Sequence, residues 1–103
     1  MTALHQLALS YPEALDEAAD DRRAYKARQK SFLFLGGGDD SFTMMVKLSQ
    51  SLAEVEELKR REPARYEIGE EGWVTATFPR ETPPSQEMLE RWVDESYRNT
   101  VPV

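Results

Sequence analysis

The chain has 103 residues, no cysteine and a formal net charge of −6 at pH 7. A chain of this length forms a single domain, here residues 1–103, that can bury a core without covalent cross-links, and the lack of cysteine excludes disulfides and thiolate metal sites. The acidic balance also argues against general nucleic-acid binding by the whole surface, because phosphate contact requires local positive charge.

The first predicted element is an amphipathic helix near the N-terminus. It rests on four apolar residues at helical spacing: Leu4, Leu7, Ala8 and Tyr11. Pro12 limits this helix, and the acidic stretch from Glu13 to Asp21 is predicted as a loop. The segment lacks the basic start of a signal peptide, and no apolar run in the chain approaches the roughly 20 residues that cross a bilayer. We therefore expect a soluble, cytoplasmic protein with no membrane contact.

Three strands are predicted next. Residues 24–28 (AYKAR) and 31–35 (SFLFL) form two extended runs, with Gln29 and Lys30 as the tight turn between them. From Phe42 to Ser49 large apolar residues alternate with other residues, which is the period of a strand.

A glycine-rich stretch from Gly36 to Asp40 separates the second and third of these strands. A phosphate-binding loop needs glycines that lead into a helix N-terminus, whereas a strand follows here. An EF-hand needs acids at alternate positions and a closing glutamate, which this stretch lacks. We therefore predict a hairpin connection whose glycines supply positive φ angles.

A second helix is predicted from Ser51 and Glu54, which have the spacing of a capping box. Its inward stripe is Leu52, Val55 and Leu58. Pro63 ends it, because proline cannot continue a helix. A short strand, a turn from Gly69 to Gly72 and a strand from Trp73 to Phe78 are predicted to follow.

The last helix has the clearest pattern. Thr82 is its predicted cap and Pro83 its first residue. Its apolar stripe is Met88, Leu89, Trp92, Val93, Ser96 and Tyr97. The element order is therefore αβββαββα, which predicts a compact α+β domain with an antiparallel sheet and helices packed on one face.

The order and spacing of several segments resemble those of the MmcQ/YjbR family along nearly the whole chain. These segments are ALSYPEA, AYKARQKSFLFL, MVKLS, GWVTATF and WVDESY. The resemblance implies a CyaY-like α+β fold and a DNA-binding role through a double wing of hairpins, a role that rests on the fold. Gln29 stands where members usually have glycine, and Glu70 and Glu71 stand where many members have basic residues.

Catalysis finds little support in the residue types. The sole histidine, His5, is predicted on the surface of the first helix, where it has no recognisable nucleophile or acid partner. Four glutamates could form an acidic ridge for a hard cation, as in the similarly folded frataxins: Glu54, Glu56, Glu57 and Glu62. We interpret them instead as a solvated helix face, and we expect no enzyme activity, no metal and no cofactor.

The polar residues of the strands indicate a candidate binding surface. If helices cover one face of the sheet, the other face carries Lys26, Arg28, Thr43, Lys47, Thr75 and Thr77, and strand alternation adds Met45 and Trp73. This surface could stack or clamp a nucleic-acid strand or dock a protein. Trp73 could instead pack under the C-terminal segment or under lysine stems. The candidate binding residues are Lys26, Arg28, Lys30, Met45, Lys47 and Trp73.

The sequence thus predicts a non-catalytic binding protein of the MmcQ/YjbR type, which binds DNA through its hairpins and an open sheet face. The alternative prediction is a protein-interaction or self-associating module with no nucleic-acid role.

Overall fold

The computed structural model describes residues 2–19, 22–37, 40–81 and 84–101. The elements in chain order are α1 (Thr2–Ser10), β1 (Leu15–Ala19), β2 (Arg22–Ala27), β3 (Lys30–Gly37), β4 (Ser41–Lys47), α2 (Leu52–Arg61), β5 (Tyr66–Ile68), the 3₁₀ turn η1 (Glu70–Gly72), β6 (Trp73–Pro79) and α3 (Gln86–Thr100).

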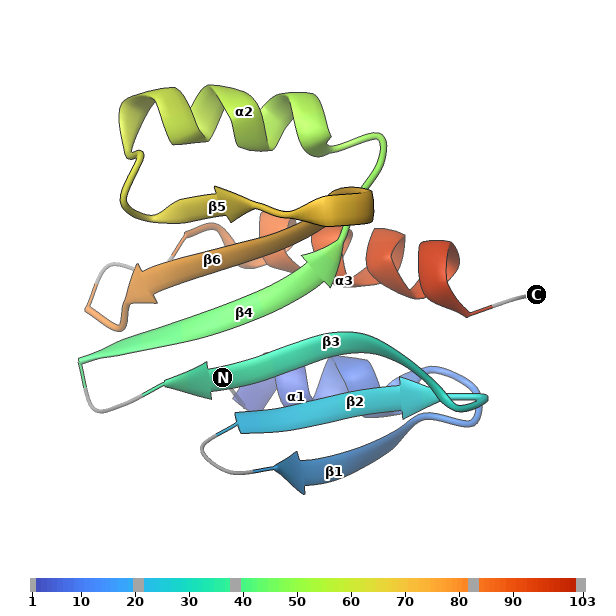
Figure 1. The fold of residues 1–103 in the computed structure, drawn as a ribbon. Helices are drawn as coiled ribbons and strands as arrows, with labels where there is room; N and C mark the ends of the chain where they lie inside the picture. The colour runs from blue at the N-terminus through green and yellow to red at the C-terminus, as the bar shows by residue number, and fades with distance from the viewer. Residues whose placement is uncertain (1, 20–21, 38–39, 82–83, 102–103) are drawn as a thin grey trace.

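The strands form one six-stranded antiparallel sheet in the order β1-β2-β3-β4-β6-β5. Helices α1 and α3 lie behind the sheet in Figure 1, and α2 lies alongside the edge strand β5. The predicted α+β class with an antiparallel sheet is confirmed. In the described part of the chain, no helix is both long enough and apolar enough to cross a membrane.

The prediction of a loop from Glu13 to Asp21 is wrong, because Leu15–Ala19 form the edge strand β1. This strand has no apolar alternation, so the sequence carries no periodic signal for it. Backbone pairing with β2 holds it in place, together with ion pairs from Asp16 to Arg23 and from Glu17 to Lys26. The end of the predicted loop, Asp20 and Asp21, lies outside the described residues.

The turn between β2 and β3 is centred on Arg28 and Gln29, one residue earlier than predicted. Their φ angles are 51° and 66°, and Ala27 pairs directly with Lys30. Two central residues with positive φ define a type I′ hairpin turn, which matches the twist of the flanking strands. Lys30 is therefore the first residue of β3 rather than part of the turn.

A bulge in β3 changes which side chains face the core. Tyr25 pairs with Leu33, but the next residue, Lys26, pairs with Ser31, so Phe32 has no partner in the β2–β3 ladder. Such an extra residue breaks the alternation of faces, and both Phe32 and Leu33 are fully buried. The hydroxyl of Ser96 on α3 donates to the Phe32 carbonyl, which satisfies the backbone of the bulge.

As predicted, β3 and β4 form an antiparallel hairpin. The predicted connection from Gly36 to Asp40 is too long, however, because β3 continues through Gly36 and Gly37, which pair with Thr43 and Phe42. Gly37 has a φ of 133°, and a Cβ atom there would lie 2.5 Å from the Ser41 carbonyl oxygen, so only glycine fits. Gly38 and Asp39 lie outside the described residues. The stretch leads into a strand rather than a helix, so it has no helix N-terminus to bind a phosphate.

The predicted stripe of α3 is confirmed, and it forms the centre of the core. Its fully buried members are Leu89, Trp92, Val93 and Ser96. The indole Nε1 of Trp92 donates to Glu54 Oε1 on α2 over 3.0 Å, which ties the two helices together. The helix begins at Gln86 and Ser85 caps it; the predicted cap Thr82 and the neighbouring Pro83 lie outside the described residues.

Ser51 precedes α2 as predicted, but the capping box does not form. The Ser51 hydroxyl donates to Glu95 Oε1 on α3 over 2.8 Å. The other carboxylate oxygen, Glu95 Oε2, accepts from the amides of Ser49 at 2.7 Å and Ser51 at 3.1 Å. A glutamate of α3 therefore satisfies the start of α2, while Glu54 binds Arg91 and Trp92 instead.

Candidate binding face of the sheet

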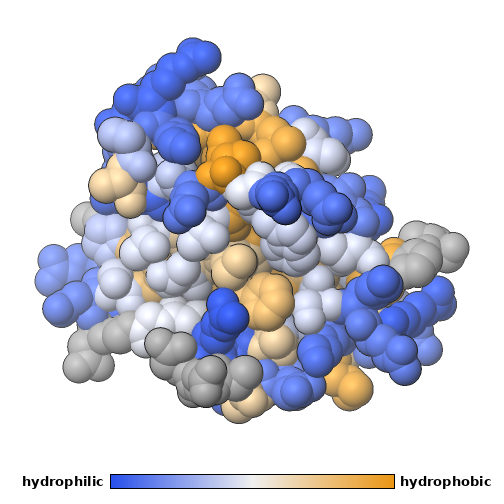
Figure 2. All heavy atoms as spheres, in the orientation of Figure 1, coloured by the Kyte–Doolittle hydropathy of each residue, from blue (hydrophilic) through white to orange (hydrophobic). Residues whose placement is uncertain are grey.

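One side of the sheet is covered by α1 and α3, and the other side is open. In β4 and β6, buried residues alternate with half-buried ones. The buried set, which belongs to the core, is Phe42, Met44, Val46, Val74, Ala76 and Phe78. The half-buried set points to the uncovered side, which we call the open face. Figure 2 shows this side, with hydrophilic residues over much of the periphery and residues of intermediate or hydrophobic character toward the middle.

Residues that pair directly across an antiparallel ladder share a face, so the register gives the layout of the open face in three rows. The first row is Arg22, Gly36, Thr43 and Thr77. The second row is Glu17, Ala24, Phe34, Met45, Thr75 and Glu67. The third row contains Leu15, Lys26 and Ser31 at one end, and Lys47 and Trp73 at the other.

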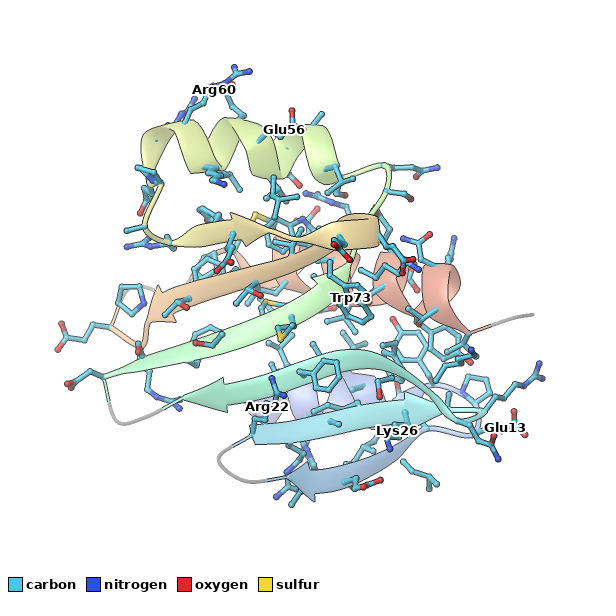
Figure 3. All side chains as sticks on the ribbon, in the orientation of Figure 1. Glu13, Arg22, Lys26, Glu56, Arg60 and Trp73 are labelled. Atoms are coloured by element: carbon cyan, nitrogen blue, oxygen red, sulfur yellow. The ribbon has the colours of Figure 1, made fainter. Side chains whose placement is uncertain are left out.

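Two aromatic rings meet on the open face. The ring centroids of Phe34 and Trp73 lie 6.0 Å apart in an edge-to-face arrangement. The Arg22 guanidinium lies over the Phe34 ring, 5.3 Å from its centroid, and Arg22 Nη1 lies 3.7 Å from Met45 Sδ. Figure 3 shows Arg22, Lys26 and Trp73 on the side of the sheet turned toward the viewer. Phe34, Trp73 and Met45 therefore form an apolar centre of the open face, and the Arg22 guanidinium lies against it.

Four of the six predicted site residues lie on this face: Lys26, Met45, Lys47 and Trp73. The prediction that Trp73 lies there is confirmed, because β4 and β6 pair without a register shift. The role of these residues in binding stays a prediction.

Arg28 was wrongly assigned to the open face, and Lys30, a candidate binding residue predicted in the turn, does not lie on the open face either. Arg28 lies in the β2–β3 turn, where its Nε donates to Glu13 Oε2 over 2.6 Å. Lys30 pairs with the buried Ala27 beside the turn, so it lies on the helix-covered side. The error arose from the position of the turn, because alternation holds only within a strand.

The sequence interpretation missed Phe34, Arg22 and Gly36. Phe34 lies in an uninterrupted apolar run, in which alternation gives no sign of which residues face outward. Arg22 precedes the predicted start of its strand by two residues. Only the strand register, including the bulge at Phe32, brings these residues together.

The cations of the open face differ in their partners. Lys26 Nζ lies 3.0 Å from Glu17 Oε2. Arg22 and Lys47 have no carboxylate partner among the residues that the structure describes. Among the described residues of this face, these two cations are therefore the candidates for contact with an anionic ligand.

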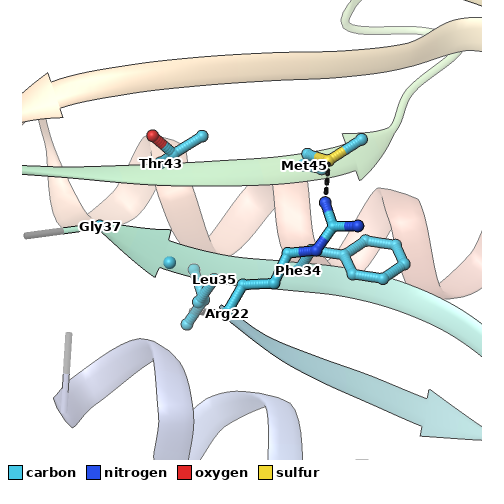
Figure 4. A pocket seen from close by; sticks show the side chains of 7 residues that line it. Arg22, Phe34, Leu35, Gly37, Thr43 and Met45 are labelled. Atoms are coloured by element: carbon cyan, nitrogen blue, oxygen red, sulfur yellow. Dashed lines mark hydrogen bonds between the residues drawn. The ribbon is translucent and has the colours of Figure 1, made fainter. Parts of the chain in front are cut away.

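Two hollows lie at the two ends of β2. One, of about 270 Å³, is lined by Arg22, Phe34, Leu35, Gly36, Gly37, Thr43 and Met45 (Figure 4). The other, of about 370 Å³, is lined by Glu13, Leu15, Asp16, Glu17, Lys26, Ala27, Arg28 and Gln29. In the second hollow the cations pair with carboxylates, Lys26 with Glu17 and Arg28 with Glu13. The first hollow is therefore the better receptor for an anion.

The other polar candidates of the sequence have structural partners. His5 is half-buried rather than fully on the surface, and its Nδ1 lies 2.8 Å from the Tyr25 hydroxyl. On α2, Glu57 pairs with Arg60 and Arg61. Across the described ranges, no group of three or more histidine, aspartate or glutamate side chains is arranged to hold a metal ion.

Comparison with known families supports a family assignment. The YjbR family model matches residues 9–99, which run from the end of α1 almost to the end of α3. A search of curated proteins gave no match. The matched region includes the whole open face.

Proposed function

The chain belongs to the YjbR family, and from that premise we propose that it is a non-catalytic protein that binds a single nucleic-acid strand across its open face. The observation that carries the proposal is the meeting of Phe34 and Trp73 on an uncovered sheet, beside cations without a carboxylate partner in the described residues. Proteins that bind single strands combine these two features, because bases stack on aromatic rings while phosphates contact cations.

A single strand suits this face better than a duplex. The turn before Trp73 exposes Glu70 and Glu71, and the β3–β4 connection exposes Asp40. If the hairpin ends contacted a duplex, these acids would repel its phosphates. Stacking also needs unpaired bases, whose faces a duplex hides. We therefore propose the sheet face, rather than the hairpin ends, as the contact surface.

The test is a titration of the protein against a fluorescein-labelled oligothymidylate of about 15 nucleotides, which is on the order of one site size. We expect Trp73→Ala to weaken binding by about 1–3 kcal/mol, the scale of one stacking contact. Because Trp73 is only half-buried, the variant should keep its fold, and circular dichroism checks this.

The salt dependence of the binding constant distinguishes phosphate contacts from stacking contacts. We expect Arg22→Ala and Lys47→Ala each to reduce the slope of log K against log salt by about 0.7, the value for one contact to a single strand. Trp73→Ala should leave the slope unchanged. Arg60→Ala on α2 is the matched control, because it removes the same charge far from the open face. Unchanged affinity and slope in all three open-face variants would refute the proposal.

A second candidate function is self-association through the same face. The specific observation in its favour is Leu15, which is 71% exposed at the end of the third row. Tryptophan, methionine and arginine are also enriched in protein interfaces. Sedimentation velocity without nucleic acid tests this candidate. A dimer that Trp73→Ala abolishes, combined with no binding of the oligonucleotide, would replace the first proposal by the second.

A further inference from the structure

Gly36 lies inside strand β3, where its φ does not require glycine. It pairs with Arg22 on one side and with Thr43 on the other. Glycine weakens a strand interior, and it often marks a place where a ligand approaches closely. The neighbouring Gly37 has a positive φ that requires glycine, whereas Gly36 does not have a positive φ.

The missing side chain at Gly36 has a visible consequence on the open face. It lies between Arg22 and Thr43 in the first row, and all three residues line the hollow of about 270 Å³. Pockets that enclose drug-sized ligands have roughly 300–1,000 Å³, so this hollow fits one ring system rather than a whole cofactor. Its remaining walls come from Phe34, Leu35 and Met45.

We propose that this hollow receives one unpaired nucleobase of a bound strand, an inference that rests on the proposed function. The Arg22 guanidinium lies over the Phe34 ring and also lines the hollow. A base in the hollow extends this stack, because bases stack on guanidinium planes as well as on aromatic rings. The adjoining phosphate lies within reach of the same arginine.

The polar and apolar walls suit a base in particular. Met45 supplies a polarizable thioether beside the guanidinium. On the opposite side, Thr43 Oγ1 lies 3.1 Å from Thr77 Oγ1, so this pair of hydroxyls keeps a donor or acceptor for a base edge. The hollow has no carboxylate among its described lining residues, so nothing in that lining repels the phosphate that accompanies the base.

Filling the hollow tests the inference. Gly36→Val adds a side chain on the open face at a strand position without a positive φ, so we expect the melting temperature to be unchanged or higher. The probes are a labelled oligothymidylate and an abasic strand of the same length, which keeps the phosphates and lacks the bases. Gly36→Val should weaken oligothymidylate binding by at least about tenfold, the order of one stacking contact, and abasic-strand binding by less than about twofold.

A second pair of variants fills the hollow from the neighbouring strand. Thr43→Leu adds bulk opposite Gly36, while Thr43→Val keeps the volume of threonine and removes only the hydroxyl. We expect Thr43→Leu to weaken oligothymidylate binding as Gly36→Val does, and Thr43→Val to weaken it much less. The two Thr43 variants test whether the hollow receives a base even if Gly36→Val does not fold.

The outcomes separate the two proposals. If the wild-type protein binds oligothymidylate and both filling variants bind it equally well, the open face remains a binding surface but the base hollow is refuted. Equal losses for the oligothymidylate and the abasic strand would also refute it, because the change then acts on the phosphates. If the wild-type protein binds neither strand, both proposals are wrong.

Discussion

The hydrogen bonds of the Glu95 carboxylate lead to a prediction about the stability of the fold. The carboxylate accepts three hydrogen bonds at the start of α2: from the Ser49 amide, the Ser51 amide and the Ser51 hydroxyl, at 2.7, 3.1 and 2.8 Å. Glu95→Gln keeps the shape of the side chain but removes the charge and turns one acceptor oxygen into a donor nitrogen. With its amide oxygen toward the two backbone N–H groups, the glutamine keeps those bonds only as neutral ones, and the Ser51 hydroxyl must accept from the amide nitrogen instead of donating.

We expect Glu95→Gln to lower the free energy of unfolding at pH 7 by about 1–3 kcal/mol. A hydrogen bond to a charged group contributes about 1.5–3 kcal/mol, and loss of a helix cap costs about 0.5–2 kcal/mol. The three bonds share one carboxylate and are partly exposed to solvent, so their contributions do not add in full. The loss is a substantial part of the roughly 5–15 kcal/mol by which domains are stable.

The pH dependence gives a sharper test than the size of the effect. Partial burial raises the pKa of Glu95, but the bonds from Ser49 and Ser51 outweigh burial, so the pKa lies below its usual value. A lowered pKa in the folded state means that the stabilisation is complete above the unfolded value of about 4.3. It is lost as the pH falls through the folded pKa. The difference between wild type and Glu95→Gln should therefore be largest near neutral pH and shrink in acid.

Urea unfolding followed by circular dichroism, at pH values from about 7 down to about 3, measures this difference across the window set by the glutamate pKa. Glu56→Gln is the matched control, because Glu56 is an exposed glutamate on α2. It should change stability by less than about 0.5 kcal/mol, as surface substitutions do. A Glu95→Gln loss that is absent at neutral pH, or that persists undiminished in acid, would show that Glu95 does not act as a charged cap.

Three further variants test the core and the β2–β3 hairpin. Trp92→Ala should cost about 3–5 kcal/mol, because Trp92 is fully buried. Trp92→Phe should cost less, because it keeps a ring and loses mainly the bond to Glu54; equal costs measured by urea unfolding would contradict this packing. Gln29→Gly should raise the free energy of unfolding by up to about 1 kcal/mol. It removes the cost of about 1–2 kcal/mol that a non-glycine residue has in the left-handed conformation. The greater chain entropy of glycine in the unfolded state, about 0.5–1 kcal/mol, offsets part of this gain. A lower melting temperature would argue against the positive φ at Gln29.

The helices and central strands were predictable because their apolar residues follow the period of the element. In α3 the stripe from Leu89 to Tyr97 marks the buried side, and in β4 and β6 strict alternation marks both faces. The same alternation correctly put Met45 and Trp73 on the open face, since neither strand has a bulge in their shared ladder.

The sequence could not show features that depend on contacts between distant residues. Strand β1 is defined by pairing with β2 rather than by its own pattern. The cap of α2 comes from Glu95, which is 44 residues away from Ser51 in the chain, so a local capping box was the wrong explanation. On the open face, Phe34 could not be assigned without the bulge at Phe32, which shifts the faces of β3. The stack of Arg22 on Phe34 depends on that assignment.

The net charge of −6 limits how this chain can bind a strand. Arg22 and Lys47 are the cations of the open face without a carboxylate partner among the described residues. If each neutralises one phosphate, log K should fall with log salt with a slope of roughly −1.4, which is twice the value for one contact.

Such a slope corresponds to a loss of about sevenfold between about 50 and 200 mM salt, against about 10³–10⁵-fold for proteins with six to ten phosphate contacts. Most of the binding free energy must then come from stacking on Trp73 and Phe34 and from the hollow over Gly36, which salt affects little. A measured slope steeper than about −3 would require more phosphate contacts than the open face offers. In that case the strand would follow a path over other cations, and the proposed contact surface would be wrong.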